Sequence, residues 1–485
     1  MGILSKLHVL GYWQIIRTVQ SVCKHGYTLL ALLDSVKNIN EAEAYIKDDD
    51  GQVSYNDLYE QSVAMANYLH KKYQIKSGCK VVIISSNSVA FVKSLFAASG
   101  LGTDIFLMNP NQKGDYFNDF FQLHKIDLII GDSIIAGEFE NYSIPFFNYN
   151  DTIDFSTKWD KNAVTRKKGN IVILSSGSTG IPKVEKRKVS ILKYLNPLVD
   201  IIMRLHLKEN RSVLISVPIF HGYGLAAFVL SVFMGQKIRL TKKFNPEGTA
   251  KIIQQDNVDC WVAVPLMIQK VHGEGLATSL KNIISGGDVL PPAIINAVRQ
   301  KSSVKIYNMY GTSETGVYTN ATNDDLNKYP DTIGKIISGI QTKVIDADGK
   351  SVGHNEVGAL LIKCGWSSDD KSDLYISTGD LVCVNSEGYY FYKGRQDDMM
   401  VIGGENIYPV EIENVIYKHP AISWVKAGSF IDENDVARIH VDLVLKPHTY
   451  INEKEFLTWT SINVPKYMIP KNVVFHDHEP VTKLL

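Results

Sequence analysis

The chain of 485 residues is long enough to fold into more than one domain around a large hydrophobic core. Its 51 basic and 51 acidic side chains cancel, which argues against nucleic acid as the main partner because such binding usually leaves a basic surface. The five cysteines are scattered, without a C-x-x-C pair or a cysteine–histidine cluster. We therefore expect buried thiols in a reducing, cytoplasmic setting rather than disulfides or a zinc site.

Residues 3–33 are rich in leucine, isoleucine, valine and aromatic side chains, but Lys6, Arg17 and Lys24 interrupt them. No apolar run approaches the roughly 20 residues of a membrane-spanning helix, and no small-residue cleavage site indicates a signal peptide. Two interpretations of this helical extension, residues 1–40, stay open. It either lies on a membrane surface as an amphipathic segment or packs as a helix pair against the following domain, and we favour the packed pair.

Short apolar strands alternate with helical segments from about residue 80 to residue 330, which predicts βαβ units and parallel sheets in two halves of similar design. The predicted strands are 81–84, 104–108, 126–130, 171–174, 212–216, 237–240 and 261–264. From about residue 331, segments 342–345, 358–363 and 388–392 indicate a smaller β-rich subdomain with antiparallel strands. A final α+β piece of about 90 residues follows, with a helix at 409–417 and a strand at 437–446.

The sequence S-S-G-S-T-G-I-P-K at residues 175–183 directly follows one of the predicted strands. Successive backbone N–H groups in such a glycine-rich loop form an anion-binding nest, and the hydroxyls and Lys183 add further donors. A polyphosphate is the expected ligand, with a flexible Ser/Gly linker as the plain alternative. Only two residues separate the glycines and Pro182 precedes the lysine, so the loop differs from a Walker A motif.

Further motifs follow the loop in a fixed order. A Y-G-x-T-E-like sequence lies at 310–314, T-G-D at 378–380, a hinge-like sequence at 394–398 and a glycine-rich loop at 403–413, with weaker matches at 218–221 and 285–287. Together they resemble the adenylate-forming superfamily of acyl-CoA synthetases, carrier-protein adenylation domains and luciferases, from about residue 40 onward. The resemblance implies an α/β fold: an AMP-binding domain over 1–395, with two stacked βαβ sheet halves and the β-rich subdomain, and a small mobile α+β domain over 396–485.

The resemblance also implies a site for ATP and Mg²⁺. The loop would hold the β- and γ-phosphates, with Thr179 and Lys183 as its main side-chain contacts. Glu314 would hold Mg²⁺, Tyr310 would stack on adenine, and Asp380 would accept hydrogen bonds from both ribose hydroxyls. The remaining nucleotide-binding residues would be Ser176, Gly177, Ser178, Gly180, Gly286, Gly287, Gly311, Thr312, Ser313 and Arg395.

The second half-reaction in the family uses coenzyme A after the small domain has rotated. By resemblance, Asp397 is the hinge residue, and Gly403 and Gly404 line the entry of the pantetheine chain. His221 would lie beside the substrate carboxylate and the acyl tunnel, although a buried structural histidine is the alternative. We therefore predict Thr179, Lys183, His221 and Glu314 as the catalytic residues.

The sequence departs from the family at its C-terminal end. The family motif P-x-T-x-x-G-K corresponds to residues 480–485, and the aligned lysine would fall one residue beyond Leu485, so the small domain looks truncated. In the family this lysine bridges carboxylate and phosphate during adenylation. We expect the first half-reaction to depend on whether Lys483 can substitute for it.

The function that these residues predict is an ATP-dependent acyl-CoA ligase, most simply for a medium- or long-chain fatty acid. The N-terminal extension and the small residues Gly222, Gly224, Ala226 and Ala227 near His221 motivate that substrate. The alternatives are an aryl or o-succinylbenzoate CoA ligase, a free-standing enzyme that loads a separate carrier protein, and a non-catalytic nucleotide-binding remnant.

Overall fold

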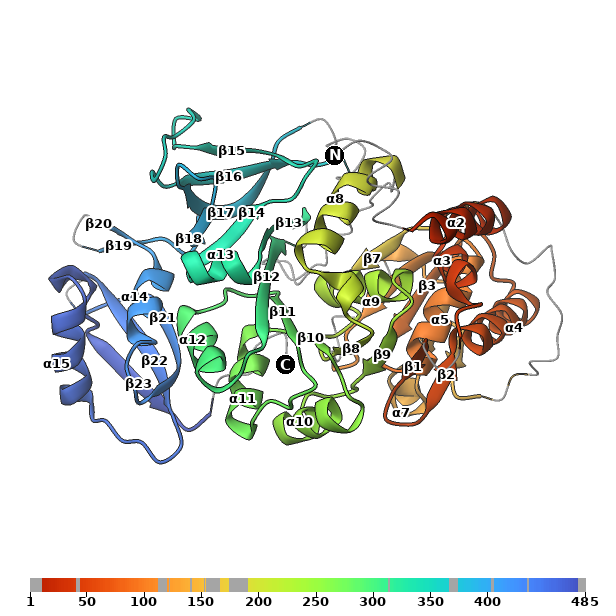
Figure 1. Cartoon of the computed structure of the whole chain (residues 1–485), viewed down its shortest axis with the longest axis horizontal. Helices are drawn as coiled ribbons and strands as arrows, with labels where there is room; N and C mark the ends of the chain where they lie inside the picture. Colours follow the sequence, from red (N-terminus) through yellow and green to blue (C-terminus); the bar gives the residue numbers. More distant parts are fainter. Residues whose placement is uncertain are drawn as a thin grey trace.

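The structure, a computed structural model, describes residues 11–40, 44–111, 120–121, 123–139, 142–151, 153, 166–173, 191–312, 315–365, 374–402, 405–433 and 436–478. Figure 1 shows two sheet-containing parts of a large domain, with a smaller α+β part at one end and the N-terminal helices at the other. The predicted α/β architecture is therefore confirmed.

A five-stranded parallel sheet carries the first βαβ units in the described part of the chain. Strands at its centre, such as Lys80–Ile84, are buried almost throughout because helices cover the sheet, which explains their uninterrupted apolar sequences. In spatial order the strands are β6 (Phe146–Asn148), β5 (Leu128–Gly131), β3 (Lys80–Ile84), β4 (Asp104–Met108) and β7 (Ile171–Ile173).

The second sheet has thirteen strands among the described residues and is parallel from β9 through β12, then antiparallel. The predicted β-rich subdomain is the antiparallel end of this sheet, which it joins because β14 pairs with both β13 and β18. In spatial order the strands are β15 (Gln341–Ile345), β16 (Gly358–Lys363), β17 (Ile376–Val384), β18 (Tyr390–Arg395), β14 (Thr332–Ile336), β13 (Gly316–Ala321), β12 (Lys305–Thr312), β11 (Asn282–Gly286), β10 (Cys260–Ala263), β8 (Ser212–Ile215), β9 (Lys237–Leu240), β1 (Tyr45–Lys47) and β2 (Gln52–Ser54).

The helices mostly begin at capping residues that the sequence supplies. Ser54, Ser88 and Asn245, for example, each accept a hydrogen bond from a backbone N–H of the first helical turn. None of the described helices is long and apolar enough to cross a membrane. The helices of the large domain are α2 (Tyr12–His25), α3 (Leu29–Val36), α4 (Tyr55–Tyr73), α5 (Val89–Gly100), α7 (Ser133–Ala136), α8 (Ile191–Arg204), α9 (Gly222–Phe233), α10 (Pro246–Gln255), α11 (Pro265–Glu274), α12 (Pro292–Lys301) and α13 (Asn323–Lys328).

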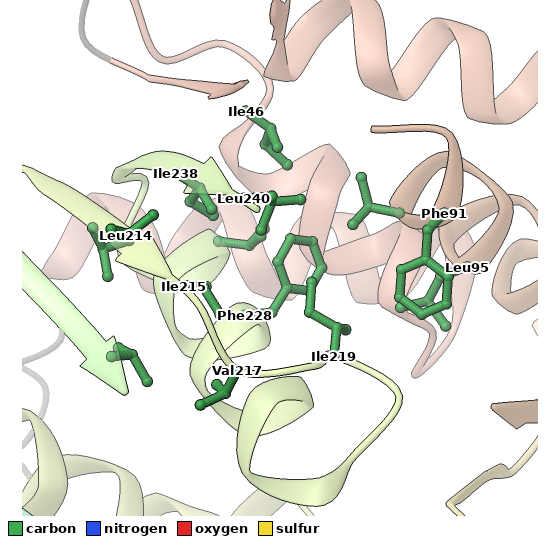
Figure 2. Close-up of a cluster of buried hydrophobic side chains, with 14 of the residues drawn as sticks. Ile46, Phe91, Leu95, Leu214, Ile215, Val217, Ile219, Phe228, Ile238 and Leu240 are labelled. Carbon is green, nitrogen blue, oxygen red and sulfur yellow. The ribbon is translucent and has the colours of Figure 1, made fainter. Parts of the chain in front are cut away.

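Helix α9 is held in the main hydrophobic core. Figure 2 shows Phe228 of α9 among side chains from β8 and β9, with Phe91 and Leu95 of α5 on its other side. Phe228 is fully buried, and its ring centroid lies 5.9 Å from that of Phe96. Because α5 belongs to the five-stranded sheet and β8 to the large sheet, this core fixes the start of α9 relative to both sheets.

The C-terminal region has a hydrophobic core of its own, which runs from Met400 to Val473. It contacts the large domain, where the amide of Gln269 donates to the backbone oxygen of Ser423. The predicted division after Arg395 stays a prediction, as does the mobility of the small domain. The elements of this region are β19 (Met400–Ile402), β20 (Glu405–Ile407), α14 (Pro409–Ile416), β21 (Ile422–Ile431), β22 (Ala437–Leu445), α15 (Glu453–Asn463) and β23 (Asn472–His476).

Helices α2 and α3 are joined through one carboxylate. Asp34 Oδ2 accepts a hydrogen bond from Ser21 Oγ at 2.8 Å and lies 3.6 Å from Nε2 of the fully buried His25, while Lys37 Nζ lies 3.0 Å from Oδ1. Although burial of Asp34 opposes its charge, hydrogen bonds from His25, Lys37 and Ser21 hold its pKa well below the usual range. An ionised Asp34 thus joins the two helices of the predicted pair, and Leu30, Leu33 and Val36 of α3 pack in the main hydrophobic core of the large domain.

We expect Asp34→Asn to lower the free energy of unfolding at neutral pH by about 2 kcal/mol, since charged hydrogen-bond partners lose their carboxylate. A carboxyl group with a lowered folded-state pKa stabilises above its unfolded-state pKa, which is about 3.9, and this contribution is lost as the pH falls towards the folded-state value. Chemical denaturation should therefore show a difference between wild type and variant at neutral pH that shrinks in acid. An unchanged difference in acid, or an equal loss for Asp348→Asn in an exposed turn, would contradict this account.

Candidate functional site

The candidate site lies at the carboxyl ends of parallel strands, where α/β sheets bind ligands. Strand β11 ends at Gly286, and the neighbouring β12 carries Tyr310 beyond it. Strand β7 ends at Ile173, whose Cδ1 lies 3.7 Å from the position of a Cβ on Gly222, the first residue of α9. The start of α9 therefore lies close to the ends of β7 in one sheet and of β11, which pairs with β12, in the other.

Asp380 is a buried carboxylate with two strong partners. It lies on β17, is 1% exposed, and accepts hydrogen bonds from Tyr318 Oη at 2.7 Å and from Arg395 Nη1 at 3.2 Å. Asp380 and Arg395 are directly paired residues of β17 and β18, so the sheet register fixes their contact. Burying an unpaired charge would be costly, and these donors make the ionised state tolerable.

Arg395 connects this carboxylate to the predicted hinge. Its Nη1 also donates to the backbone oxygen of Thr378 at 3.0 Å, and its Nε lies 3.2 Å from Oδ1 of the exposed Asp397. Gly379 has φ of +74°, and a Cβ there would lie 2.5 Å from Arg395 Nη2, so the T-G-D motif needs glycine beneath the guanidinium. In this conformation one oxygen of Asp380 is bonded to Arg395 and the other to Tyr318.

Tyr310 lies in a cluster of aromatic rings next to Asp380. Its ring centroid is 5.7 Å from that of Tyr318 and 5.5 Å from that of Tyr392. Burial and the charge of Asp380 raise the pKa of both Tyr310 and Tyr318 well above the ordinary value, so both phenols stay protonated. Tyr318 is therefore a hydrogen-bond donor to Asp380 at every physiological pH, and Tyr310 offers an aromatic face nearby.

Gly286 and Gly287 end strand β11 in a tightly packed turn. A Cβ on Gly286 would lie 2.8 Å from the ring of Tyr223, whose hydroxyl donates to the backbone oxygen of Ile284 at 2.8 Å. Gly287 has φ of +82°, in the left-handed region that favours glycine. Tyr223 belongs to the first turn of α9, which His221 directly precedes. Its hydrogen bond therefore holds the start of this helix against β11, the strand predicted to face adenine.

His221 is the residue that precedes α9, and its backbone oxygen accepts a hydrogen bond from Leu225 N at 2.9 Å. Its ring lies 4.6 Å from that of Phe220. The neighbouring small residues do not all widen a tunnel: a Cβ on Gly224 would collide with the backbone of Pro218. At Gly224 a close approach of two backbone segments, rather than room for an acyl chain, accounts for the missing side chain.

Several predicted residues lie outside the described part of the chain. They are Ser176, Gly177, Ser178, Thr179, Gly180 and Lys183 of the phosphate loop, Ser313, Glu314, Gly403, Gly404 and Lys483. Gly311 and Thr312 directly precede residues 313 and 314, which lie outside the described part. Thr312 Oγ1 lies 2.9 Å from Oγ1 of Thr315, the next described residue. The structure therefore brings together Tyr310, Asp380, Arg395 and Asp397, and the contact of Tyr223 with β11 places Gly286 close to the start of α9, which His221 directly precedes. The roles of these residues, and of those outside the described part of the chain, stay predictions.

Sequence reasoning missed Tyr318 and Tyr223. Tyr318 is 8 residues beyond Tyr310, and only the pairing of β13 with β12, together with the position of β17, brings its hydroxyl to Asp380. Tyr223 lies two residues after the predicted His221, but its contact with Gly286 depends on how α9 packs. The available signal was an aromatic residue near a motif, which more often indicates core packing.

The described residues fit a nucleotide in their chemistry. An acceptor-only carboxylate with a protonated tyrosine and an arginine beside it suits a ribose diol and a nearby phosphate, and an aromatic ring next to a glycine turn suits a base. No group of three metal-ligating side chains occurs within the described ranges, from which Glu314 is missing. If Mg²⁺ binds through one carboxylate, phosphate oxygens and water, no such group is required.

Comparison with known proteins identifies relatives along nearly the whole chain. A 2-succinylbenzoate–CoA ligase of Bacillus cytotoxicus is 25% identical over 461 residues, which is 90% of this chain and 92% of the relative. The crystal structure of an anthranilate CoA ligase, AuaEII, with anthranoyl-AMP has a TM-score of 0.84 at 18% identity and covers 94% of this chain and 95% of its own. The o-succinylbenzoate CoA synthetase of Bacillus subtilis with ATP and a magnesium ion has a TM-score of 0.79 at 22% identity, with coverage of 93% and 96%.

The family comparison agrees with the motifs. The model of the family described as "AMP-binding enzyme" matches residues 33–366, which contain the phosphate loop, the Y-G-x-T-E-like motif and Asn308 to Thr312 at the end of β12. These matches confirm the predicted resemblance and support the predicted class of AMP-forming acid–thiol ligase with ATP, Mg²⁺ and coenzyme A. The chain belongs to the AMP-binding enzyme family.

Proposed function

We propose that this chain is an ATP-dependent CoA ligase that activates an aromatic carboxylic acid as its acyl-AMP and then transfers the acyl group to coenzyme A. The observation that carries this proposal is the near full-length match to ligases named for 2-succinylbenzoate and anthranilate, both aromatic acids. It favours the aryl alternative over the fatty-acid substrate that the sequence first indicated.

The described site also gives less support to a fatty acid than the sequence did. One of the small residues that motivated a long acyl tunnel, Gly224, is required by the close approach of Pro218. Phe220 is 8% exposed and lies ring to ring with His221, so the segment before α9 is aromatic and well packed. Flat aromatic surfaces of this kind suit an aryl substrate at least as well as an alkyl chain.

The proposed chemistry explains why a nucleotide site is needed. A carboxylate is a poor electrophile because its leaving group would be oxide. Attack of a carboxylate oxygen on the α-phosphorus of ATP releases pyrophosphate and gives a mixed anhydride, and attack of the coenzyme A thiol on its carbonyl carbon releases AMP. The protein contributes positioning and charge stabilisation in both steps. Mg²⁺, held by Glu314 in this proposal, would neutralise phosphate charge.

Within this scheme Arg395 links nucleotide binding to the hinge. The guanidinium is bound to Asp380 and Asp397 in the described conformation. A ribose that takes its place at Asp380 would free Arg395 to contact phosphate. Since Arg395 is the last residue of β18 and Asp397 the predicted hinge, this exchange of partners offers a physical route by which a bound nucleotide affects the orientation of the small domain.

The substrate prediction can be tested with the purified chain, ATP, Mg²⁺, coenzyme A and a panel of acids that contains 2-succinylbenzoate, anthranilate, benzoate, octanoate and palmitate. We expect acyl-CoA from an aryl acid with kcat/KM at least about tenfold above either fatty acid, a difference of about 1.4 kcal/mol. Mass spectrometry identifies the products, and synthetic acyl-AMP in parallel reactions separates the two half-reactions. A preference for octanoate or palmitate would restore the fatty-acid reading.

The same experiment distinguishes the other candidate functions. Acyl-AMP that accumulates and never yields acyl-CoA would favour an enzyme that loads a carrier protein. ATP binding without pyrophosphate release would favour a non-catalytic remnant. Thioester formation only from supplied acyl-AMP would localise the defect to adenylation.

Tyr318→Phe tests the role of the Asp380 network. Loss of the hydroxyl removes a hydrogen bond to a charged group, worth about 1.5 kcal/mol at the lower end, so we expect the KM for ATP to rise roughly tenfold with kcat little changed. The matched control is Tyr390→Phe, because Tyr390 Oη bonds Thr342 Oγ1 at 2.7 Å in the same part of the sheet. Both variants should lose some thermal stability. An equal effect of both on the KM for ATP would assign Tyr318 a purely structural role.

Glu314→Gln tests the metal assignment. The amide keeps the shape of the side chain and removes the charge that a divalent cation prefers, so we expect the Mg²⁺ concentration for half-maximal pyrophosphate release to rise about tenfold or more. Thioester formation from supplied acyl-AMP should be nearly unaffected, since that step releases no pyrophosphate. Normal Mg²⁺ dependence of the variant would remove Glu314 from the metal site.

A further inference from the structure

Helix α2 is oriented with polar side chains towards the protein. Gln14 donates to the backbone oxygen of Phe233, Ser21 Oγ donates to Asp34, and His25 is fully buried beside the same carboxylate. A surface helix normally directs its apolar side inwards, and in α2 these polar contacts replace much of that side. The inner face of α2 is held to the fold by hydrogen bonds and one ion-pair network, together with the partly buried Ile15, which packs against the main hydrophobic core.

The outer face of α2 carries large apolar side chains. Trp13, Ile16 and Val19, here called the apolar stripe, are 77%, 46% and 56% exposed and follow one another at the spacing of a helix face. Tyr27, in the turn after the helix, is 58% exposed. A contiguous set of exposed apolar and aromatic residues on one helix is typical of an interaction surface rather than of random surface composition.

The charges around the stripe are basic. Arg17 and the half-exposed Lys24 lie on α2, and Lys24 Nζ lies 3.4 Å from Oδ1 of Asp34, the first acidic residue of the whole sequence, whose carboxylate faces α2 from the inside. A second segment adds to this charge: the backbone of Arg166 packs so closely on Gly26 that no side chain would fit there, and Arg166 and Lys167 are both exposed. The stripe is thus bordered by cations and has no acidic residue on its own helix.

We propose that the apolar stripe of α2 docks on the surface of an anionic lipid bilayer. Tryptophan and tyrosine are the side chains that prefer the bilayer interface, aliphatic residues between them enter the acyl boundary, and basic neighbours are attracted by anionic headgroups. A second copy of this chain fits less well, because a two-fold contact between identical stripes would bring Arg17 and Lys24 of both copies together. The proposal is independent of the acid that the enzyme activates.

The position of α2 in the molecule permits this contact. Figure 1 shows α2 on the periphery of the large domain, at the end opposite to α14, α15 and the strands β21, β22 and β23. A bilayer that meets this face leaves the small domain free. The hydrogen bonds of Gln14 and Ser21 keep the stripe turned outwards while the helix stays attached to the enzyme.

The test is co-sedimentation of the intact chain with phosphatidylcholine vesicles, with and without about one third phosphatidylglycerol. We expect at least tenfold tighter binding to the anionic vesicles, weakened by salt, and a loss of at least tenfold in the double variant Trp13→Glu, Ile16→Glu. The matched control is Tyr450→Glu, Ile462→Glu, which places the same charges at residues 82% and 79% exposed in the small domain and should bind like wild type. A chain that stays in solution with both vesicles, or an equal loss in the control, would overturn the proposal.

A second measurement covers the case in which the double variant folds poorly. An environment-sensitive fluorophore attached to the exposed Cys23, on the same helix, should shift to the blue with anionic vesicles and not with neutral ones, and the Cys23→Ser variant reports labelling elsewhere. Binding seen only after removal of residues 1–10 would mean that this segment covers the stripe. If wild type self-associates without binding vesicles, and the double variant does not self-associate, the stripe contacts a second copy of the chain. Either result would overturn the lipid proposal.

Discussion

The buried carboxylate of Asp380 is the constraint on which the candidate site depends. A charge with so little exposure must keep strong donors, and the fold supplies them from two other strands: Tyr318 from β13 and Arg395 from β18. The network therefore ties the middle of the large sheet to its antiparallel end. Because Arg395 also bonds Asp397, the network reaches the start of the C-terminal region, so the predicted ribose ligand, the sheet architecture and the predicted hinge residue share one set of contacts.

A second constraint is the packing of α9 between the two sheets. Phe228 fills the core that β8, β9 and α5 share, and this position determines where the helix begins. At that end, Tyr223 bonds β11 and Gly222 lies near the end of β7. Hydrophobic burial thus brings residues predicted to contact nucleotide and acid close to one another, although the hydrophobic effect is itself non-directional.

The N-terminal helices show how hydrogen bonding can oppose hydrophobic patterning. Burial of apolar surface alone would turn the stripe of α2 inwards, yet Asp34 binds Ser21, His25 and Lys37 and holds the opposite face against the protein. The two interpretations of the extension that the sequence left open are therefore compatible. Helix α3 packs in the core of the large domain through Leu30, Leu33 and Val36, whereas α2 turns polar side chains inwards and leaves its apolar stripe available for a surface.

The order of motifs was sufficient to identify the family, because phosphate, ribose and metal sites each require particular residue types at short spacings. Strand positions such as 104–108 and 237–240 were predicted within a residue, since buried parallel strands are apolar over their length. The predicted β-rich subdomain proved to be part of the large sheet, because strand order is decided by pairings between residues far apart in sequence.

The sequence by itself determined the fold class, the family and the residues that each motif contains, because these follow from local chemistry and periodicity. Only the tertiary structure decided that Asp380 is bonded by Arg395 and Tyr318, and that the backbone of Pro218 leaves no room for a side chain at Gly224. It also decided that α2 presents its apolar stripe outwards. Each of these depends on contacts between segments remote in the chain, whose geometry no local pattern of residues contains.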